Sequence, residues 1–176
     1  MDPLSHVCSG ILLGQALQPP RAVRRQTLLV MGVAAFAPDV DAISYLWGPE
    51  AYSRIHHTYT HTILGMGILA MSLAAIERAC MRSMPLARLL ALNLAGGCVH
   101  LLGDLIAVWP LRLLWPWSAQ DFARGFTGDF DLVVLIVGGL ATGLAATDAL
   151  QGRAPLILGV VAVVLGTYFW LFPGLA

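Results

Sequence analysis

Six apolar segments occupy more than half of this chain and leave it few ways to fold. They cover about residues 7–17, 27–37, 62–76, 86–109, 130–147 and 155–172. None of them shows the sustained alternation of apolar and polar residues that is typical of membrane β-strands. We therefore expect an all-α protein. Gly and Ala recur in the later segments, and such small residues permit close packing between helices in lipid.

The scarcity of charge places these helices in a membrane. Of the 176 residues, 58% are hydrophobic and only 11% are charged, whereas soluble domains average about 25% charged residues. So few charges cannot cover a soluble globule of this size. Segments 7–17 and 27–37 are shorter than the about 20 residues of a full span, and the second is expected to stop at Pro38. The expectation is a polytopic integral membrane helical bundle, with about four to six membrane-embedded helices in a single domain over residues 1–176.

Arginine gives the bundle an orientation. The chain has no lysine, and seven of its ten arginines fall in the connections after the first, third and fifth segments. Cytoplasmic loops carry the excess of basic residues, so these connections are expected to be cytoplasmic. We therefore predict a multi-pass protein of the cell (inner) membrane. With alternating spans, the histidines and most aspartates described next would lie together on the extracytoplasmic side.

His100 and Asp104 are the strongest candidate pair for chemistry. They are four residues apart in an apolar segment, so on a helix they share one face. An isolated Asp at the centre of a membrane helix costs about 2.5–3.5 kcal/mol on insertion scales, and something must offset this cost. Three readings stay open: ligation of a metal, a His–Asp hydrogen bond between two helices, and a proton relay.

Two further clusters extend this pattern. His57 and His61 are also four residues apart, and His56 stands beside them. Asp39 and Asp41 lie in a turn after Pro38, where two carboxylates can bind one cation, bridge two, or only solvate a helix end. Thr60 is expected to cap the helix that follows.

These ligand types indicate which metal could bind. Mixed His and carboxylate ligands suit Zn²⁺, and also Mn²⁺ or Fe²⁺. We expect one to two divalent transition-metal ions, most readily zinc. The sequence contains neither a GxSxG nucleophile motif nor an HExxH zinc motif, which are the signatures of other hydrolase classes. The net charge is zero, so nothing indicates nucleic-acid binding.

Five motifs together resemble a known family. The chain carries, in order, MDPLSH at residues 1–6, PDVD at 38–41, HHTYTHT at 56–62, HLLGD at 100–104 and LLWPWS at 113–118. They resemble the MDxxTH, PDxD, HRxxTHS, HxxxD and LLWPFS motifs of the YdjM-like family of bacterial and archaeal membrane proteins, which are classed as metal-dependent hydrolases. The chain differs at His57, where the family pattern has Arg.

The resemblance implies a set of metal-site positions. They are His6, Asp39, Asp41, His56, His61, His100 and Asp104. The order of these residues is also similar to that of the zinc-dependent phospholipase C and P1 nuclease group, all-α enzymes that cleave phosphodiesters. That group has further histidines downstream, whereas none follows His100 here. The resemblance therefore favours one or two ions over three.

The function we expect is metal-dependent hydrolysis at the membrane, of a phosphoester in a membrane lipid or a lipid-linked substrate. The expected metal ligands are His6, Asp39, His61, His100 and Asp104. Asp41 would orient or deprotonate the attacking water, and His56 or His57 would protonate the leaving group or stabilise the phosphoryl oxygens.

A Trp- and Pro-rich connection adds candidate substrate contacts. Residues 109–118 hold three Trp and two Pro, a composition typical of an anchor at the membrane interface. The alternative is that the rings line a pocket for a lipid. On that reading Trp115, Trp117 and Arg112 are expected to contact the substrate.

Two other function classes stay open. Intramembrane His and Asp can form the relay of a metal or proton transporter, but a transporter needs polar groups on both sides of the midplane. A metal could instead join the helices of a non-catalytic scaffold. A closed four-ligand shell would favour the scaffold, and an open coordination position would favour catalysis.

Overall fold

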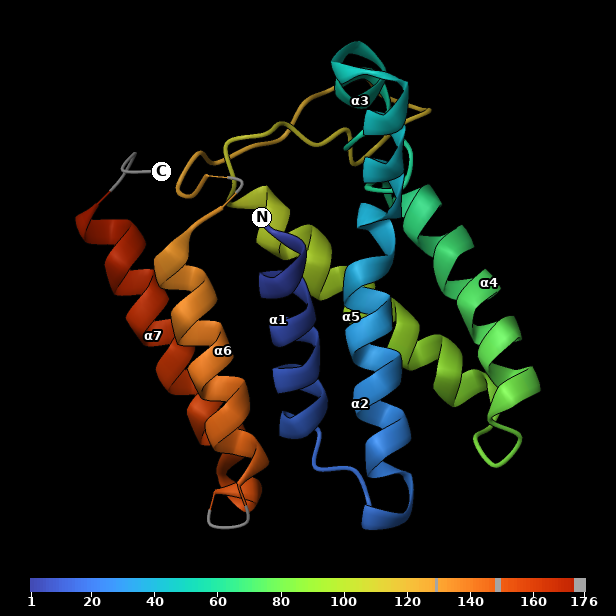
Figure 1. Ribbon diagram of the computed structural model, residues 1–176, viewed down its shortest axis with the longest axis vertical. Coiled ribbons are helices and arrows are strands. Elements are labelled where there is room, and N and C mark those ends of the chain that lie inside the picture. The colour runs from blue at the N-terminus through green and yellow to red at the C-terminus, as the bar shows by residue number, and fades with distance from the viewer. Residues whose placement is uncertain (129, 148–149, 173–176) are drawn as a thin grey trace.

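A computed structural model describes residues 1–128, 130–147 and 150–172, and its regular structure is helical throughout (Figure 1). The elements in chain order are α1 (Pro3–Ala16), α2 (Arg21–Phe36), the 3-10 helix η1 (Ala37–Trp47), α3 (Pro49–Ile55), α4 (Ile63–Cys80), α5 (Leu86–Leu105), α6 (Leu132–Ala146), the 3-10 turn η2 (Gln151–Arg153) and α7 (Ala154–Leu171). The described residues form no strand beyond two isolated bridges in the α5–α6 loop. The predicted all-α membrane bundle is confirmed.

Four helical stretches among the described residues are long and apolar enough to cross a membrane. They are Arg21–Trp47, Ile63–Cys80, Leu86–Leu105 and Ala154–Leu171. The prediction that the second segment is too short for a full span is wrong, although its α-helix ends at Phe36, just before Pro38, as predicted. Pro38 lies in the first turn of η1, where a missing N–H costs nothing, so the helical rod continues past it to Trp47.

Side-chain caps fix where helices α1 and α4 begin. Asp2 caps α1 by accepting hydrogen bonds from the backbone N–H of Ser5 (3.0 Å) and from its hydroxyl (2.6 Å). Thr62 caps α4 by accepting from the backbone N–H of Gly65 (2.8 Å). The predicted cap, Thr60, is wrong by two residues, because its hydroxyl donates to Asp41 instead.

Helix α2 lies at the centre of the bundle and packs against both α1 and α5. Glycines permit the close approach. A Cβ placed at Gly10 of α1 would lie 2.5 Å from the carbonyl oxygen of Met31, and one at Gly96 of α5 would lie 2.6 Å from the Cβ of Ala34. In lipid, where apolar side chains gain little from avoiding the solvent, such close contact is a main source of helix association.

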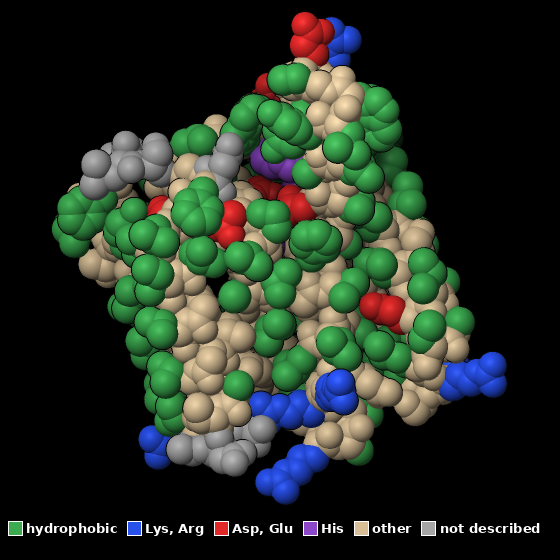
Figure 2. All heavy atoms as spheres, in the orientation of Figure 1, with side chains coloured by type: hydrophobic (Ala, Val, Ile, Leu, Met, Phe, Trp, Pro, Cys, Tyr) green, Lys and Arg blue, Asp and Glu red, His purple; other side chains and the backbone are tan. Residues whose placement is uncertain are grey.

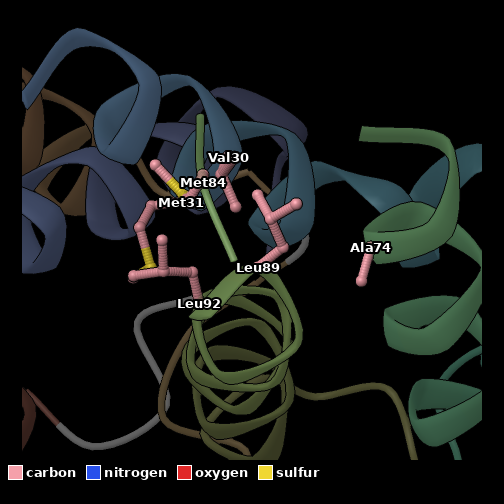
Figure 3. Close-up of a cluster of buried hydrophobic side chains, with 6 residues drawn as sticks. All are labelled: Val30, Met31, Ala74, Met84, Leu89 and Leu92. Atoms are coloured by element: carbon pink, nitrogen blue, oxygen red, sulfur yellow. The ribbon is translucent and has the colours of Figure 1, made fainter. Parts of the chain in front are cut away.

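Two buried clusters complete the core. One joins α2, α4, α5 and the α4–α5 loop (Figure 3) and comprises Val30, Met31, Ala74, Met84, Leu89 and Leu92. The other packs α6 and α7 onto α1 and comprises Leu12, Ala141, Ala145 and Ala154. The outer helix α7 leaves apolar side chains such as Val163 and Leu156 exposed on its surface, as a lipid-facing helix requires.

The alternation of the helices separates polar groups by type. The N-terminus, α3 and the long α5–α6 loop lie at one end of the bundle, and the α1–α2, α4–α5 and α6–α7 connections lie at the other (Figure 1). Histidine and most acidic side chains gather at the first end, whereas most basic side chains gather at the second (Figure 2). We refer to these as the His/Asp end and the Arg end.

Candidate metal centre

Helices α1 and α5 bring three polar side chains together inside the His/Asp end. His100 and Asp104 lie one turn apart on α5, with His100 Nε2 2.9 Å from Asp104 Oδ2. From α1, the His6 ring stacks on the His100 ring at 3.8 Å between centroids, and its Nε2 lies 3.0 Å from Asp104 Oδ1. All three side chains are at most 1% exposed. The spacing of His100 and Asp104 in the sequence therefore gives the one face of α5 that was predicted.

Asp39 and His61 close this cluster from two other elements. Asp39 stands in the first turn of η1, and its Oδ1 lies 3.5 Å from His61 Nε2 and 3.8 Å from His100 Nε2. His61 comes from the irregular segment before α4, and its Nε2 is also 3.5 Å from Asp104 Oδ2. Residues that are distant in sequence thus meet in one buried volume, which we call the His/Asp cluster: His6, Asp39, His61, His100 and Asp104.

Several atoms of the His/Asp cluster lack a hydrogen-bond partner. They are Nδ1 and Nε2 of His6, Oδ2 of Asp39, Nε2 of His61, Nε2 of His100 and Oδ2 of Asp104. Two of these nitrogens, Nε2 of His100 and Nε2 of His6, do lie close to Asp104. Neither contact is aligned as a hydrogen bond, so these atoms remain without a partner. Buried polar atoms are nearly always satisfied, so a cation that accepts their lone pairs is the missing partner that fits.

The donor geometry suits such a cation. His6, Asp39 and His100 form one group whose ligand atoms lie within 4.8 Å of one another, and His61, His100 and Asp104 form a second. The two groups share His100. Imidazole nitrogen and carboxylate oxygen are the ligands of zinc and related divalent ions. The residues present therefore fit either one ion or two neighbouring ions.

A surrounding set of hydrogen bonds orients two of these histidines. The carbonyl oxygen of Ala35 lies 2.6 Å from His100 Nδ1; because a carbonyl can only accept, Nδ1 carries the proton and Nε2 is left with a lone pair. On the opposite side, Asp41 Oδ2 lies 3.3 Å from His61 Nδ1 and accepts from the Thr60 hydroxyl at 2.5 Å. Such outer partners fix the tautomer and direction of metal-binding histidines.

Asp41 is engaged on both of its oxygens. Its Oδ1 lies 2.6 Å from His56 Nδ1, while its Oδ2 serves Thr60 and His61. The carboxylate therefore links His56 and His61 through their Nδ1 atoms. Its predicted role as the base that activates water stays a prediction, and the contacts favour a positioning role instead.

His56 and His57 form a second layer with His61. Their ligand atoms and those of His61 also lie within 4.8 Å of one another. His57 is 5% exposed and has φ of 64°, a left-handed conformation that is uncommon for residues other than glycine. Its ring meets the rings of His56 and His61 at 4.1 Å and 4.5 Å and the edge of Trp109 at 6.1 Å.

The environment separates the protonation of His57 from that of His61. Burial, followed by the charges of His61 and His56, lowers the pKa of His57 to about 2, so its imidazole is neutral at ordinary pH. Burial alone would also lower the pKa of His61. The nearby carboxylates of Asp39, Asp41 and Asp104 outweigh burial and raise that pKa to about 9.

A cavity of about 170 Å³ opens beside the His/Asp cluster. Its walls include the two residues of the second layer, His56 and His57, and one predicted ligand, Asp39. The other lining residues are Met1, Asp2, Pro3, Ala42, Tyr52 and Phe130. Because His56 is the most exposed of the five histidines, a molecule entering from outside meets the second layer first.

The structure does not bring Trp115, Trp117 and Arg112 to this cavity. Trp115 packs edge-on against Tyr59, with ring centroids 5.1 Å apart. Trp117 is 75% exposed, and Arg112 pairs with Asp121 at 3.2 Å on the surface. Their expected contact with a substrate stays a prediction.

Several contacts of the site carry no mark in the sequence. The Ala35 carbonyl that orients His100 belongs to an ordinary alanine in an apolar run. The α-amino group of Met1 donates to Asp104 Oδ1 at 2.6 Å, a contact that the residues of MDPLSH do not predict. Tyr52 stacks on His56 at 4.5 Å; its position one turn before His56 could have indicated it, had α3 been recognised as a helix.

The fold and the site define a class: a polytopic helical membrane protein that buries a His/Asp cluster near one end of its bundle. Comparison with known families is more specific. The chain matches the YdjM inner membrane protein family over residues 1–173 and belongs to that family. It is therefore an inner membrane protein. Neither a curated protein nor a solved structure matches it.

Proposed function

We propose that this protein is a membrane-bound metal-dependent hydrolase. The observation that carries the proposal is the His/Asp cluster, whose buried ligand atoms lack hydrogen-bond partners and lie beside a cavity lined by two further histidines. A cluster that only joined helices would need no opening. The cavity supports catalysis because it lets a reactant reach the cluster.

The proposed metal-holding residues are those of the cluster: His6, Asp39, His61, His100 and Asp104. Zinc fits this donor set best, with manganese or iron as alternatives, in one or two ions. A divalent ion bound there would supply Lewis acidity and a hydrolytic nucleophile at neutral pH. The hydrogen bonds of His100 Nδ1 to the Ala35 carbonyl and of His61 Nδ1 to the Thr60 hydroxyl (2.9 Å), with Asp41 Oδ2 3.3 Å from the same nitrogen, support the assignment, since each leaves Nε2 directed to the cluster.

Asp41 and His56 form the proposed proton-handling pair. Asp41 Oδ1 lies 2.6 Å from His56 Nδ1, so the carboxylate orients the imidazole. His56 also lines the cavity and can donate a proton to a leaving group there. His57, neutral because its pKa is about 2, can only stabilise reacting oxygens through an N–H.

The proposed substrate is a phosphoester of a lipid or a lipid-linked molecule. The cluster lies at one end of a bundle whose helices are apolar enough to cross a membrane, so a substrate held in the membrane would present its headgroup at that depth. Exposed apolar side chains near the same end, including Trp47 and Leu46 at 71% and 78% exposure, would sit at the membrane surface. Since the arginines gather at the opposite end, we propose that the site faces the extracytoplasmic side.

Metal content tests the first half of the proposal. Purified protein should carry about one to two equivalents of zinc per chain by elemental analysis. Asp104→Asn should lose most of it, because Asp104 approaches three histidines. Asp121→Asn is the matched control, since Asp121 is a surface residue paired with Arg112, and this variant should keep the full complement. Equal metal in both variants would rule out the cluster as the site.

Turnover tests the second half. The zinc-loaded protein should hydrolyse at least one member of a panel of lipid phosphomonoesters, phosphodiesters and lipid-linked diphosphates. A chelator should abolish the activity and zinc should restore it. His56→Gln should lower the rate by about 10²–10⁴-fold, the usual contribution of a general acid. If the metal-loaded protein turns over no phosphoester, the metal centre is structural and the proposed hydrolase activity is contradicted.

A further inference from the structure

A second cavity, larger than the one beside the His/Asp cluster, lies elsewhere in the bundle. It is an open groove of about 720 Å³ between α2 and α6, with α1 as its floor. Its lining residues are Val7, Ile11, Gln15, Arg24, Arg25, Leu28, Leu29, Gly32, Val33, Phe36, Thr142, Gly143 and Ala146. We propose that this groove binds an anionic phospholipid, with an acyl chain along the groove and the headgroup phosphate on Arg24 and Arg25.

The shape of the groove suits one acyl chain. Nearly all of its wall is apolar, apart from the two arginines, Gln15 and Thr142, and its volume lies within the about 300–1,000 Å³ typical of ligand pockets. From Arg25 to Phe36, helix α2 rises about 16 Å. That is close to half of the about 30 Å hydrocarbon core, so the groove runs the depth of one leaflet.

The positive charge at one end of the groove determines which lipid headgroup the groove should select. Arg24 and Arg25 stand in the first turns of α2, at the Arg end. Among the described residues neither guanidinium has an acidic partner. Guanidinium groups bind phosphate oxygens with two parallel hydrogen bonds, and basic residues next to a span attract anionic lipids of the cytoplasmic leaflet. A zwitterionic lipid would bring a cation as well as a phosphate to the same two arginines.

This lipid is distinct from the substrate proposed above. No residue of the His/Asp cluster lines the groove, and the phosphate on Arg24 and Arg25 would lie at the opposite end of the bundle from His100 and Asp104. Val7 and Phe36, at the far end of the groove, would contact only the end of the acyl chain. The proposed lipid site therefore holds whether or not the cluster is catalytic.

Native mass spectrometry of the purified full chain tests the headgroup. Wild-type protein titrated with phosphatidylglycerol should form a one-lipid complex at lower lipid concentration than with phosphatidylcholine. In Arg24→Gln/Arg25→Gln this preference should fall by about 25-fold, taking about five-fold for each basic residue. Arg82→Gln/Arg88→Gln is the matched control, because it removes two arginines of the same end that do not line the groove and should keep the preference. An equal loss in both variants, or no preference in the wild type, would overturn the proposal.

A second pair of variants tests the acyl chain. Gly143 lines the groove and a Cβ there meets no atom within 4 Å, so the ring of Gly143→Phe should enter the groove. Gly159→Phe on α7 is equally unhindered but lies outside the groove. Only Gly143→Phe should lose the one-lipid complex, and both should keep the metal content of the wild type. Retention of the lipid in Gly143→Phe would exclude the groove as the site, while the metal readout reports on the proposed hydrolase separately.

Discussion

Two histidines of the cluster are fixed through one ring nitrogen and present the other to their neighbours. His100 is held through Nδ1 by the Ala35 carbonyl, and His61 through Nδ1 by the Thr60 hydroxyl and the Asp41 carboxylate. At the scale of residues, the pairing of His100 with Asp104 could be predicted, because four residues on a helix make one face. The same spacing in His57 and His61 gives no shared helical face, since residues 56–62 form turns before α4. The turn conformation brings the rings of His57 and His61 together.

The contacts of Asp41 predict how a variant at this position should behave. Asp41→Asn keeps the volume of the side chain but weakens its hold on His61 and His56. Loss of such an outer partner typically costs about 10–100-fold in metal affinity or activity. Zinc affinity measured by competition with a chelating indicator should therefore fall by that factor, with the helical content unchanged. Unaltered zinc affinity with a turnover reduced by about 10²–10⁴-fold would instead restore Asp41 as the general base.

The raised pKa of His61 predicts that metal binding depends on pH. A ligand imidazole must be neutral, and with a pKa of about 9 His61 is protonated at neutral pH in the metal-free protein. Binding then releases this proton, so apparent zinc affinity should rise about ten-fold per pH unit from pH 7 and level off near pH 9. The same competition titration at several pH values measures the slope. His57→Gln should not change it, because His57 is already neutral in this range; a flat profile in the wild type would contradict His61 as a ligand.

At the scale of elements, the six apolar segments found from composition correspond to α1, α2 with η1, α4, α5, α6 and α7. Their ends were harder to predict. Helix α5 ends at Leu105 and not near Trp109, because the chain then pairs with the loop at Thr127. Helix α3 was missed, since none of its seven residues is buried and it has no apolar face to reveal it. Tertiary partners, which the sequence does not display, decide both cases.

The contact of α5 with α2 predicts that one methyl group will disturb the site. In Gly96→Ala the new Cβ would lie 2.6 Å from the Cβ of Ala34, so α2 must shift away from α5. This shift would also move the neighbouring Ala35 carbonyl away from His100. Overpacking of this kind costs roughly 1–3 kcal/mol. Thermal unfolding in detergent should show the loss, and zinc content should fall with it. Gly67→Ala on α4, where a Cβ meets nothing within 4 Å, should leave both unchanged; a Gly96→Ala protein as stable as this control would contradict the close packing.

At the scale of the whole molecule, alternation of the helices converts a scattered sequence pattern into two chemically different ends. The histidines and aspartates of the first four motifs are spread over residues 2–104. They meet because each of these motifs ends or begins a helix at the same end of the bundle. This convergence followed from the sequence once the spans were taken to alternate. The depth of the cluster did not, because it depends on how closely α1, α2 and α5 approach one another at their glycines.

The gathering of arginines at the opposite end predicts which end faces the cytoplasm. Basic loops stay inside, so the α4–α5 connection should be cytoplasmic and the α5–α6 loop extracytoplasmic. Single cysteines at Ser83 and Gln120, both exposed positions, report on the two loops. They are introduced after Cys8, Cys80 and Cys98 are replaced by Ala, since all three native thiols are free. A membrane-impermeant maleimide added to intact cells should label Gln120→Cys alone, and lysed cells should label both. Labelling of Ser83→Cys alone in intact cells would instead show that the His/Asp cluster faces the cytoplasm. The proposed substrate would then have to be one that is reached from the cytoplasmic side.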